Sequence, residues 1–420
     1  MLSRRQFIQL GAGSAVSIAL YGCSSSSSSG RRAASTASTA STASPSSPES
    51  AATAPVAASS TTSGASLSTP GPRTLVIIQL NGGNDGLNTL VPSDGRYRDA
   101  RPTLAIPEAD LVALNGMNDW SLHPQLAPLG KYWDAGHVNF LPGIGFSDPN
   151  HSHFVSLDRW WRADDLSART GWLGRSITGD GTKPLYATAL GSSAPLLIGD
   201  HYQAAVVLQP ASFDFPKALP SDRLQMLTSP VDQDPLLALA QRSLASSIDA
   251  VASFQSLHDT STVSGDQVPE REGNFNLVEG LDVAARLVLG DVGARIVVVS
   301  VGGFDTHSNQ LATHKVLYAD LAAGIDGFLT KVAAAGRADD TLLVTTSEFG
   351  RRVGENASGG FDHGAGGLSM MFGPMVKGGV LTTVDLGDQL DGDVRPVLDP
   401  RTMYTACLDW IGADPTASLG

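Results

Sequence analysis

The sequence has 420 residues, enough for one large domain or two medium ones with a sizeable core. Its 28 Lys and Arg stand against 41 Asp and Glu, and the resulting net charge of −13 argues against a nucleic-acid partner, which requires clustered basic residues. Two cysteines rule out a disulfide-stapled scaffold and a Cys-rich metal site. No uninterrupted apolar run of about 20 residues is present, as a polytopic membrane protein would need.

The N-terminal residues are typical of an export signal. Arg4 and Arg5 precede residues 7–20, a weakly apolar run that is too short and too rich in Gly, Ala and Ser to span a bilayer. The arginine pair followed by Phe7 resembles a twin-arginine signal. We therefore expect residues 1–22 to be a signal peptide for twin-arginine export.

The run ends in Leu-Tyr-Gly-Cys, which resembles a bacterial lipobox with Cys23 as the acylated residue. The alternative is an ordinary, incidental cysteine. Ser24 favours the outer membrane, so we expect a lipid-anchored protein that faces the periplasm or the cell surface. Residues 23–72 are almost entirely Ser, Thr, Ala and Pro, which cannot bury enough apolar surface to fold and predict a disordered tether. The ordered domain is then residues 73–420.

Short runs rich in β-branched residues predict the strands of this domain. Residues 74–80 are apolar almost throughout and lie between Pro72 and a Gly-rich turn, which indicates a strand buried on both faces of a parallel sheet. Further runs predict strands at residues 138–141, 295–301, 341–346 and 368–372.

Apolar residues at three- and four-residue spacing predict helices between the strands, at residues 317–332, 237–251 and 275–289. Alternation of buried strands with helices predicts one α/β domain with a mostly parallel central sheet and helices on both faces.

Polar side chains follow the predicted strands. In open α/β sheets ligands bind at the carboxyl ends of the strands, so these positions are candidates for a site. Carboxylates and imidazoles gathered there are the ligands that a divalent cation requires. Each segment alone could also be a simple turn. The candidate segments are residues 81–88, 149–153, 302–307, 347–352 and 361–364.

Several of these segments carry specific motifs: GGNDGLN (residues 82–88), TGWLGR (170–175), GFDTH (303–307), SEFGR (347–351) and DHG (362–364). On these motifs the chain resembles the bacterial family DUF1501, a branch of the alkaline phosphatase/sulfatase superfamily. The resemblance implies an alkaline phosphatase-like sandwich. It also implies one or two divalent cations, with zinc expected first and magnesium, calcium or manganese as alternatives.

The resemblance assigns roles to particular residues. It implies metal ligands at Asp85, Asp305, His307, Glu348, Asp362 and His363. Ser152 is the candidate nucleophile at the start of a helix, whose N-terminus would stabilise an alkoxide; its alternative role is a helix cap. His153 is a candidate proton donor to a leaving group, and Arg351 a candidate ligand for a phosphate or sulfate oxygen.

One position departs from the superfamily pattern, which has Asp-His where this chain has Glu348 and Phe349. The loss of an imidazole leaves one full metal site and one incomplete one.

We expect a metal-dependent hydrolase of phosphate or sulfate esters, acting on a small-molecule or glycan ester in the cell envelope. The alternatives are a lipid-anchored binding or assembly protein that has lost turnover, and a transferase of phosphoryl or headgroups onto envelope glycans.

Overall fold

The computed structural model describes residues 72–177, 183–214, 221–228, 234–259 and 276–419. The predicted signal peptide, Cys23 and the tether up to residue 71 lie outside the described residues. None of the described helices is both long and apolar enough to cross a membrane.

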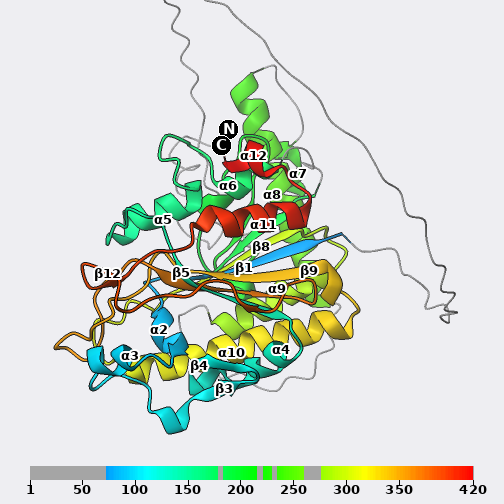
Figure 1. The fold of residues 1–420 in the computed structure, drawn as a ribbon. Helices are drawn as coiled ribbons and strands as arrows, with labels where there is room; N and C mark the ends of the chain where they lie inside the picture. The colour runs from blue at the N-terminus through cyan, green and yellow to red at the C-terminus, as the bar shows by residue number, and fades with distance from the viewer. Residues whose placement is uncertain (1–71, 178–182, 215–220, 229–233, 260–275, 420) are drawn as a thin grey trace, which may run out of the picture. The chain divides into compact units, whose positions relative to one another are not determined.

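In the described part of the chain, the main sheet has eight strands in the order β11-β5-β10-β9-β1-β8-β6-β7 (Figure 1). Their bounds are β1 Thr74–Leu80, β5 Val138–Ile144, β6 Ala187–Leu190, β7 Ala205–Val207, β8 Ile296–Val301, β9 Thr341–Thr346, β10 Gly367–Phe372 and β11 Gly379–Val380.

Most neighbouring strands of this sheet are parallel. β1 lies between β8 and β9, with Ile77 opposite Val298 on one side and Val344 on the other. β10 instead runs antiparallel to both β5 and β9. The predicted fold class, an α/β domain with a mostly parallel central sheet, is confirmed.

The sheet is buried on both faces because side chains alternate along each strand. In β1, Val76 and Ile78 pack into one apolar cluster while Leu75 and Ile77 pack into another. The first cluster lies against α4 (Gly130–Asp134), α8 (Pro235–Asp259), α9 (Leu277–Leu289) and α10 (Gln310–Ala334), and the second against α5 (His153–Arg162), α6 (Trp172–Ser176), α11 (Pro400–Ile411) and α12 (Pro415–Leu419).

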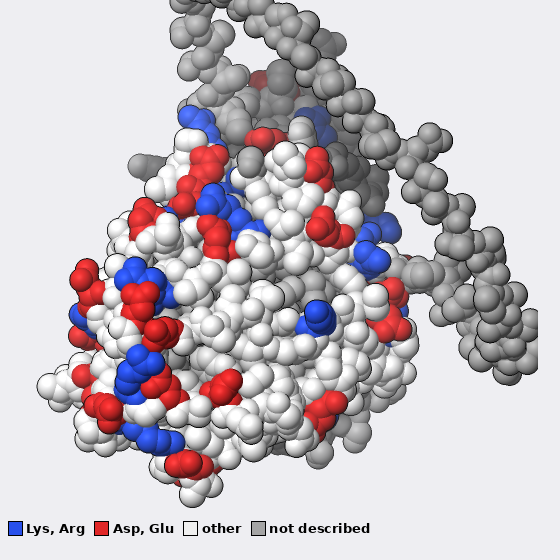
Figure 2. Space-filling model, viewed as in Figure 1, with Lys and Arg blue, Asp and Glu red and all other residues white. Residues whose placement is uncertain are grey.

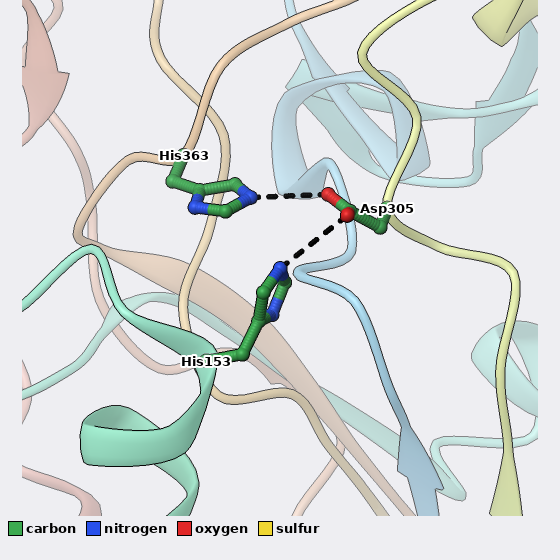
Figure 3. Close-up of side chains that lie close together, drawn as sticks. All are labelled: His153, Asp305 and His363. Carbon is green, nitrogen blue, oxygen red and sulfur yellow. Dashed lines mark hydrogen bonds and ion pairs between the residues drawn. The ribbon is translucent and has the colours of Figure 1, made fainter.

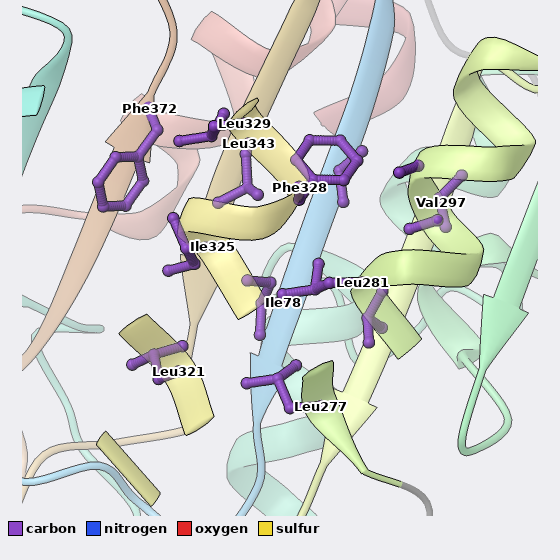
Figure 4. Close-up of a cluster of buried hydrophobic side chains, with 14 of the residues drawn as sticks. Ile78, Leu277, Leu281, Val297, Leu321, Ile325, Phe328, Leu329, Leu343 and Phe372 are labelled. Carbon is purple, nitrogen blue, oxygen red and sulfur yellow. The ribbon is translucent and has the colours of Figure 1, made fainter. Parts of the chain in front are cut away.

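The first apolar cluster contains residues of α10 at the predicted three- and four-residue spacing. Leu321, Ile325 and Phe328 of α10 point from one side of the helix onto the sheet (Figure 4). Leu277 and Leu281 of α9 lie beside them. The three predicted helices are thus present as α8, α9 and α10. α9 and α10 face the core with their apolar positions, whereas α8 does so only in its C-terminal part: Val251 is buried and Leu237 is exposed.

The remaining elements are short and lie outside the main sheet. They comprise a small antiparallel sheet of β2 (Leu90–Pro92), β3 (Val112–Leu114) and β4 (Met117–Leu122), the hairpin β12 (Gln389–Leu390) and β13 (Asp393–Val394), the helices α2 (Gly86–Thr89), α3 (Gly95–Ala100) and α7 (Ser221–Thr228), and the 3₁₀ turns η1 (Glu108–Asp110), η2 (Pro124–Leu129), η3 (Pro195–Leu197), η4 (Pro210–Ser212) and η5 (Ala338–Asp340).

The strand directions bring the candidate segments to one edge of the sheet. β1, β5, β8 and β9 end there, and the segments after them carry residues 81–88, 146–153, 302–307 and 347–352. Because β10 is antiparallel, its beginning lies at that same edge, which places the preceding residues 361–366 beside the others.

Candidate active site

Three side chains from three segments converge at this edge: His153 at the start of α5, Asp305 after β8 and His363 before β10 (Figure 3). One ligand atom from each lies within 4.8 Å of the others. His153 Nε2 is 3.4 Å from Asp305 Oδ2, and His363 Nε2 is 3.0 Å from Asp305 Oδ1. Both imidazoles therefore face the same carboxylate.

His307 approaches this group from the side. Its Nε2 is 3.1 Å from Asp305 Oδ1 and 2.9 Å from His363 Nε2. The sequence places His307 two residues after Asp305, and the chain brings both side chains to the same point. We call His153, Asp305, His307 and His363 the histidine cluster.

An oxygen atom holds the other ring nitrogen of each histidine in the cluster. His153 Nδ1 lies 2.8 Å from Glu348 Oε1, and His307 Nδ1 lies 3.1 Å from Asp362 Oδ1. His363 Nδ1 lies 2.7 Å from the backbone carbonyl of His151, which can only accept a hydrogen bond. His363 Nδ1 is thus the donor of its bond, and with a cation in place a donor at each Nδ1 would leave every Nε2 free to be a ligand.

This arrangement fits a divalent cation. Bare Nε2 atoms facing one another and a carboxylate repel unless a proton or a cation lies among them. Imidazole nitrogen and carboxylate oxygen are the ligands of zinc and related ions, and an oxygen behind each ligating histidine is the usual second layer of such sites. The residues present therefore fit the cation that the sequence predicts, and its identity is not determined by them.

The electrostatics of the cluster keep its carboxylate charged and one imidazole neutral. Burial by itself raises the pKa of Asp305, but hydrogen bonds from Arg351 and His363 outweigh it and hold the pKa at about 2. Burial lowers the pKa of His363, which its hydrogen bond to Asp305 opposes. Both effects favour the protonation states that a cation needs in its ligands.

Ser152 directly precedes His153 and occupies the N-cap position of α5. Its side chain makes no capping hydrogen bond, so the capping role that serine often has is not used here. Within the described residues its hydroxyl has no hydrogen-bond partner, and α5 places the positive end of its dipole beside it. The hydroxyl is therefore available for chemistry.

Asp85, which was expected to be a metal ligand, is placed elsewhere, and that prediction needs correction. Its side chain is fully buried, and both oxygens accept hydrogen bonds from Arg101, at 2.8 and 3.1 Å. Burial raises the pKa of Asp85, but the charge of Arg101 outweighs it and the pKa is lowered. A guanidinium thus occupies the carboxylate that a cation would need.

Glu348 and Asp362, two further expected ligands, each contact a histidine of the cluster. Glu348 Oε1 accepts from the backbone N–H of Gly82 as well as from His153, at 2.8 Å each. Asp362 binds His307 and the side chain of Asn356. Both carboxylates thus contact Nδ1 atoms of the cluster, and their expected role as metal ligands stays a prediction.

Arg351, the expected ligand for a substrate oxygen, is buried, and its guanidinium is hydrogen-bonded to surrounding backbone carbonyls. It donates to the carbonyls of Gly82, Gly83, Phe304 and Phe361, and at 2.7 Å to Asp305 Oδ1. Its guanidinium fixes the segments around the cluster and orients Asp305, and it has little capacity left for a substrate anion.

Sequence reasoning missed two parts of this arrangement. His153 was expected to donate a proton, whereas it points Nε2 at Asp305 as a ligand would. The sequence signal for this role was the His-Ser-His segment, in which His151 and His153 are two positions apart. No signal in the sequence indicated that Arg101 would return to the loop after β1.

Comparisons with known proteins address the family. A family model described as a protein of unknown function, DUF1501, matches residues 166–419, more than half of the chain. The chain belongs to this family. The resemblance predicted from the motifs is thereby confirmed. The matched range of this DUF1501 protein includes Asp305, His307 and His363, while Ser152 and His153 precede it.

Solved structures resemble it only distantly. A protein in the alkaline phosphatase superfamily from Vibrio parahaemolyticus has 10% identity and a TM-score of 0.38, with 84% of this chain and 70% of that chain covered. An alkaline phosphatase from the Antarctic bacterium TAB5 has 12% identity and a TM-score of 0.35, covering 82% and 98%. A phosphonate monoester hydrolase from Silicibacter pomeroyi has 12% identity and a TM-score of 0.35, covering 81% and 74%. None of the curated proteins matches.

Proposed function

We propose that this DUF1501 protein is a metal-dependent hydrolase of phosphate or sulfate esters. The observation that carries the proposal is the convergence of imidazole Nε2 atoms on the carboxylate of Asp305. Ser152, whose hydroxyl has no partner among the described residues, directly precedes His153 in the chain. An acidic carboxylate and neutral imidazoles bind a cation, and a free hydroxyl at a helix N-terminus is a nucleophile for an ester.

In this proposal His153, Asp305 and His363 hold the cation, with His307 beside them. Such a cation supplies Lewis acidity, which draws charge from an ester oxygen. Few protein ligands leave open positions, as catalytic sites require and closed structural sites do not. Glu348 and Asp362 keep His153 and His307 oriented, and Arg351 keeps Asp305 charged and in place.

Ser152 Oγ would attack phosphorus or sulfur, forming a new P–O or S–O bond while the bond to the leaving oxygen breaks. The first turn of α5 carries backbone N–H groups that no intrahelical carbonyl binds, and these stabilise negative charge on the attacking and equatorial oxygens. Water then releases the phosphate or sulfate from Ser152.

Two alternative functions share this site. Burial of Arg351 favours a binding or assembly protein without turnover, because a superfamily enzyme would use a free cation to hold the substrate anion. The third candidate transfers the phosphoryl group or a headgroup to a glycan hydroxyl instead of water. The signal peptide and lipid anchor expected from the sequence favour the cell envelope as the location for all three.

The test uses purified protein assayed on an aryl phosphate and an aryl sulfate, with its metal content measured by elemental analysis. Ser152→Ala should keep the metal and lose at least about a thousandfold in turnover. Asp305→Asn and His363→Ala should lose the metal, whereas His137→Ala, at the other end of β5, should keep metal and activity. Full metal occupancy in Asp305→Asn and His363→Ala would contradict the proposal.

A further inference from the structure

A second charged group lies behind the histidine cluster, and the proposed reaction does not use it. Arg101 Nη1 donates to Asp85 Oδ2 at 2.8 Å, and Nη2 donates to Asp85 Oδ1 at 3.1 Å. Their side chains are only 0% and 1% exposed. This bidentate ion pair joins the loop after β1 to the end of α3 inside the protein.

A buried ion pair is weak evidence for stability, because both charges lose their hydration and apolar residues of the same shape often serve as well. A buried pair that is retained therefore invites a search for what it positions. Here the pair has hydrogen-bonded connections towards two segments of the histidine cluster.

The first connection runs through Asp85 to the segment after β8. Gln310 Nε2 donates to Asp85 Oδ2 at 2.7 Å, and Gln310 Oε1 accepts from Thr306 Oγ1 at 2.6 Å. Thr306 stands between Asp305 and His307 in the chain. The orientation of two cluster residues thus depends on a buried chain of hydrogen bonds that starts at Asp85.

The second connection runs through Arg101 to the segment between β9 and β10. Arg101 Nε donates to the carbonyl of Val353 at 2.9 Å, and Nη2 to that of Arg352 at 3.1 Å. The guanidinium also lies 4.0 Å from the centre of the Phe361 ring, two residues before His363. One side chain therefore contacts the segment before His363 at three residues.

We propose that the Asp85–Arg101 pair positions the ligands of the metal centre. In this proposal the guanidinium of Arg101 is bound to Asp85 in the place of a second cation. This inference rests on the proposed function, since it assumes that the histidine cluster binds a cation. Its consequence is a centre with one ion per chain, whose affinity depends on two residues that do not touch the ion.

The experiment measures Zn²⁺ binding to the purified, metal-stripped protein by calorimetry, together with the melting temperature of each variant. Wild-type protein should bind one Zn²⁺ per chain. Arg101→Lys keeps the positive charge but loses the bidentate hydrogen bonding to Asp85, and should weaken Zn²⁺ binding by roughly tenfold or more. Thr306→Val removes the link to Gln310 together with the longer contacts of Thr306 Oγ1 to His314 Nε2 and the carbonyl of Phe304, and should weaken Zn²⁺ binding severalfold.

Arg337→Lys is the matched control. Arg337 also binds backbone carbonyls, those of Pro72 and Val288, but at the opposite end of the sheet. Its variant should lower the melting temperature without changing Zn²⁺ affinity, which separates positioning from general loss of stability.

Each outcome decides between the hypotheses. Two Zn²⁺ ions per wild-type chain, or a folded Arg101→Lys protein with wild-type affinity, would overturn the inference and leave the proposed function standing. Wild-type protein that binds no Zn²⁺ or Mn²⁺ would overturn both. If Arg101→Lys does not fold, Thr306→Val decides: weakened binding supports the positioning role, and unchanged binding refutes it.

Discussion

Glu348 shows how a single side chain behind a ligand can control the ligand. Its carboxylate is almost fully buried, yet it accepts hydrogen bonds from both His153 Nδ1 and the N–H of Gly82. A charged acceptor at this place holds the proton on Nδ1 and makes Nε2 a stronger donor of its lone pair. We therefore propose that Glu348 acts on the cation site through His153.

The variant Glu348→Gln tests this at the level of one atom. The amide keeps the size of the side chain but removes the charge, so Zn²⁺ affinity should fall by roughly 10- to 100-fold while the fold is retained. Competition with a chromogenic chelator measures the affinity. Glu108→Gln is the control, because Glu108 is an exposed carboxylate in the 3₁₀ turn η1. Equal affinities in wild type and Glu348→Gln would exclude this role.

Among the elements, the loop after β1 shows how closely the segments of the site pack. A Cβ on Gly82 would lie 2.3 Å from the backbone nitrogen of Asp305, and Gly82 itself has φ +118°. The neighbouring Gly83 would meet the Phe349 ring at 2.4 Å. Only glycine allows the backbone at residue 82 to approach Asp305 this closely, and only glycine at residue 83 leaves room for the Phe349 ring.

The variant Gly82→Ala should therefore disturb Asp305 as well as the fold. Positive φ costs an alanine about 1 to 2 kcal/mol, and the collision adds to it. We expect a loss of at least about 2 kcal/mol in urea unfolding, together with weakened Zn²⁺ binding. Gly302→Ala serves as the comparison, since a Cβ there meets nothing within 4 Å and should cost well under 1 kcal/mol. Similar losses in the two variants would contradict the account.

Elements with a strong local signal were predictable, and those set by distant contacts were not. β1 and β9 have the predicted bounds because buried strands are apolar throughout and end at turn residues. β6 and β7 were missed, since strands of four and three residues lack a pattern. The antiparallel direction of β10 is set by its neighbours and has no local signature.

The same distinction applies to the site. Asp305, His307 and His363 could be grouped because strand ends of one sheet share an edge. Whether a carboxylate binds the ion or orients a ligand depends on partners far along the chain. Asp85 binds Arg101 where a cation was expected, whereas the expected role of Glu348, which contacts His153, stays a prediction.

At the scale of the whole molecule, buried histidines link stability to pH. His123 and His314 are buried near Asp85, and burial lowers their pKa from 6.5 to about 4 and about 3. His314 Nδ1 has no hydrogen-bond partner in the described structure, so a proton added there would be unsatisfied. Below pH 6.5 these two histidines bind protons in the unfolded chain but stay neutral in the folded protein. The free energy of unfolding therefore falls as the pH falls.

This predicts a loss of about 2 kcal/mol per imidazole between pH 6.5 and pH 5 in urea unfolding of the metal-free protein. Asparagine at position 123 can still cap the turn η2. His123→Asn should reduce the slope of unfolding free energy against pH by the equivalent of up to one proton. His201→Asn, at an exposed position, should leave the slope unchanged. A slope in His123→Asn equal to that of wild type would show that His123 is not the source.

A bound cation should also stabilise the whole fold, because its ligands meet only in the folded state. At a free concentration 1,000 times the dissociation constant the gain is about 4 kcal/mol. Chelation should therefore lower the melting temperature of wild-type protein and leave that of Asp305→Asn unchanged. An equal shift in both proteins would mean that the chelator acts elsewhere.

The carbonyl that fixes His363 belongs to His151, two positions before His153. A displacement of this short stretch, which also carries Ser152, the proposed nucleophile, would turn the His153 ring away and break the hydrogen bond that fixes His363 in the same movement. Departure of the ion should then be concerted, with no long-lived partly liganded species, and its rate should follow the opening of that stretch instead of the strength of any single bond.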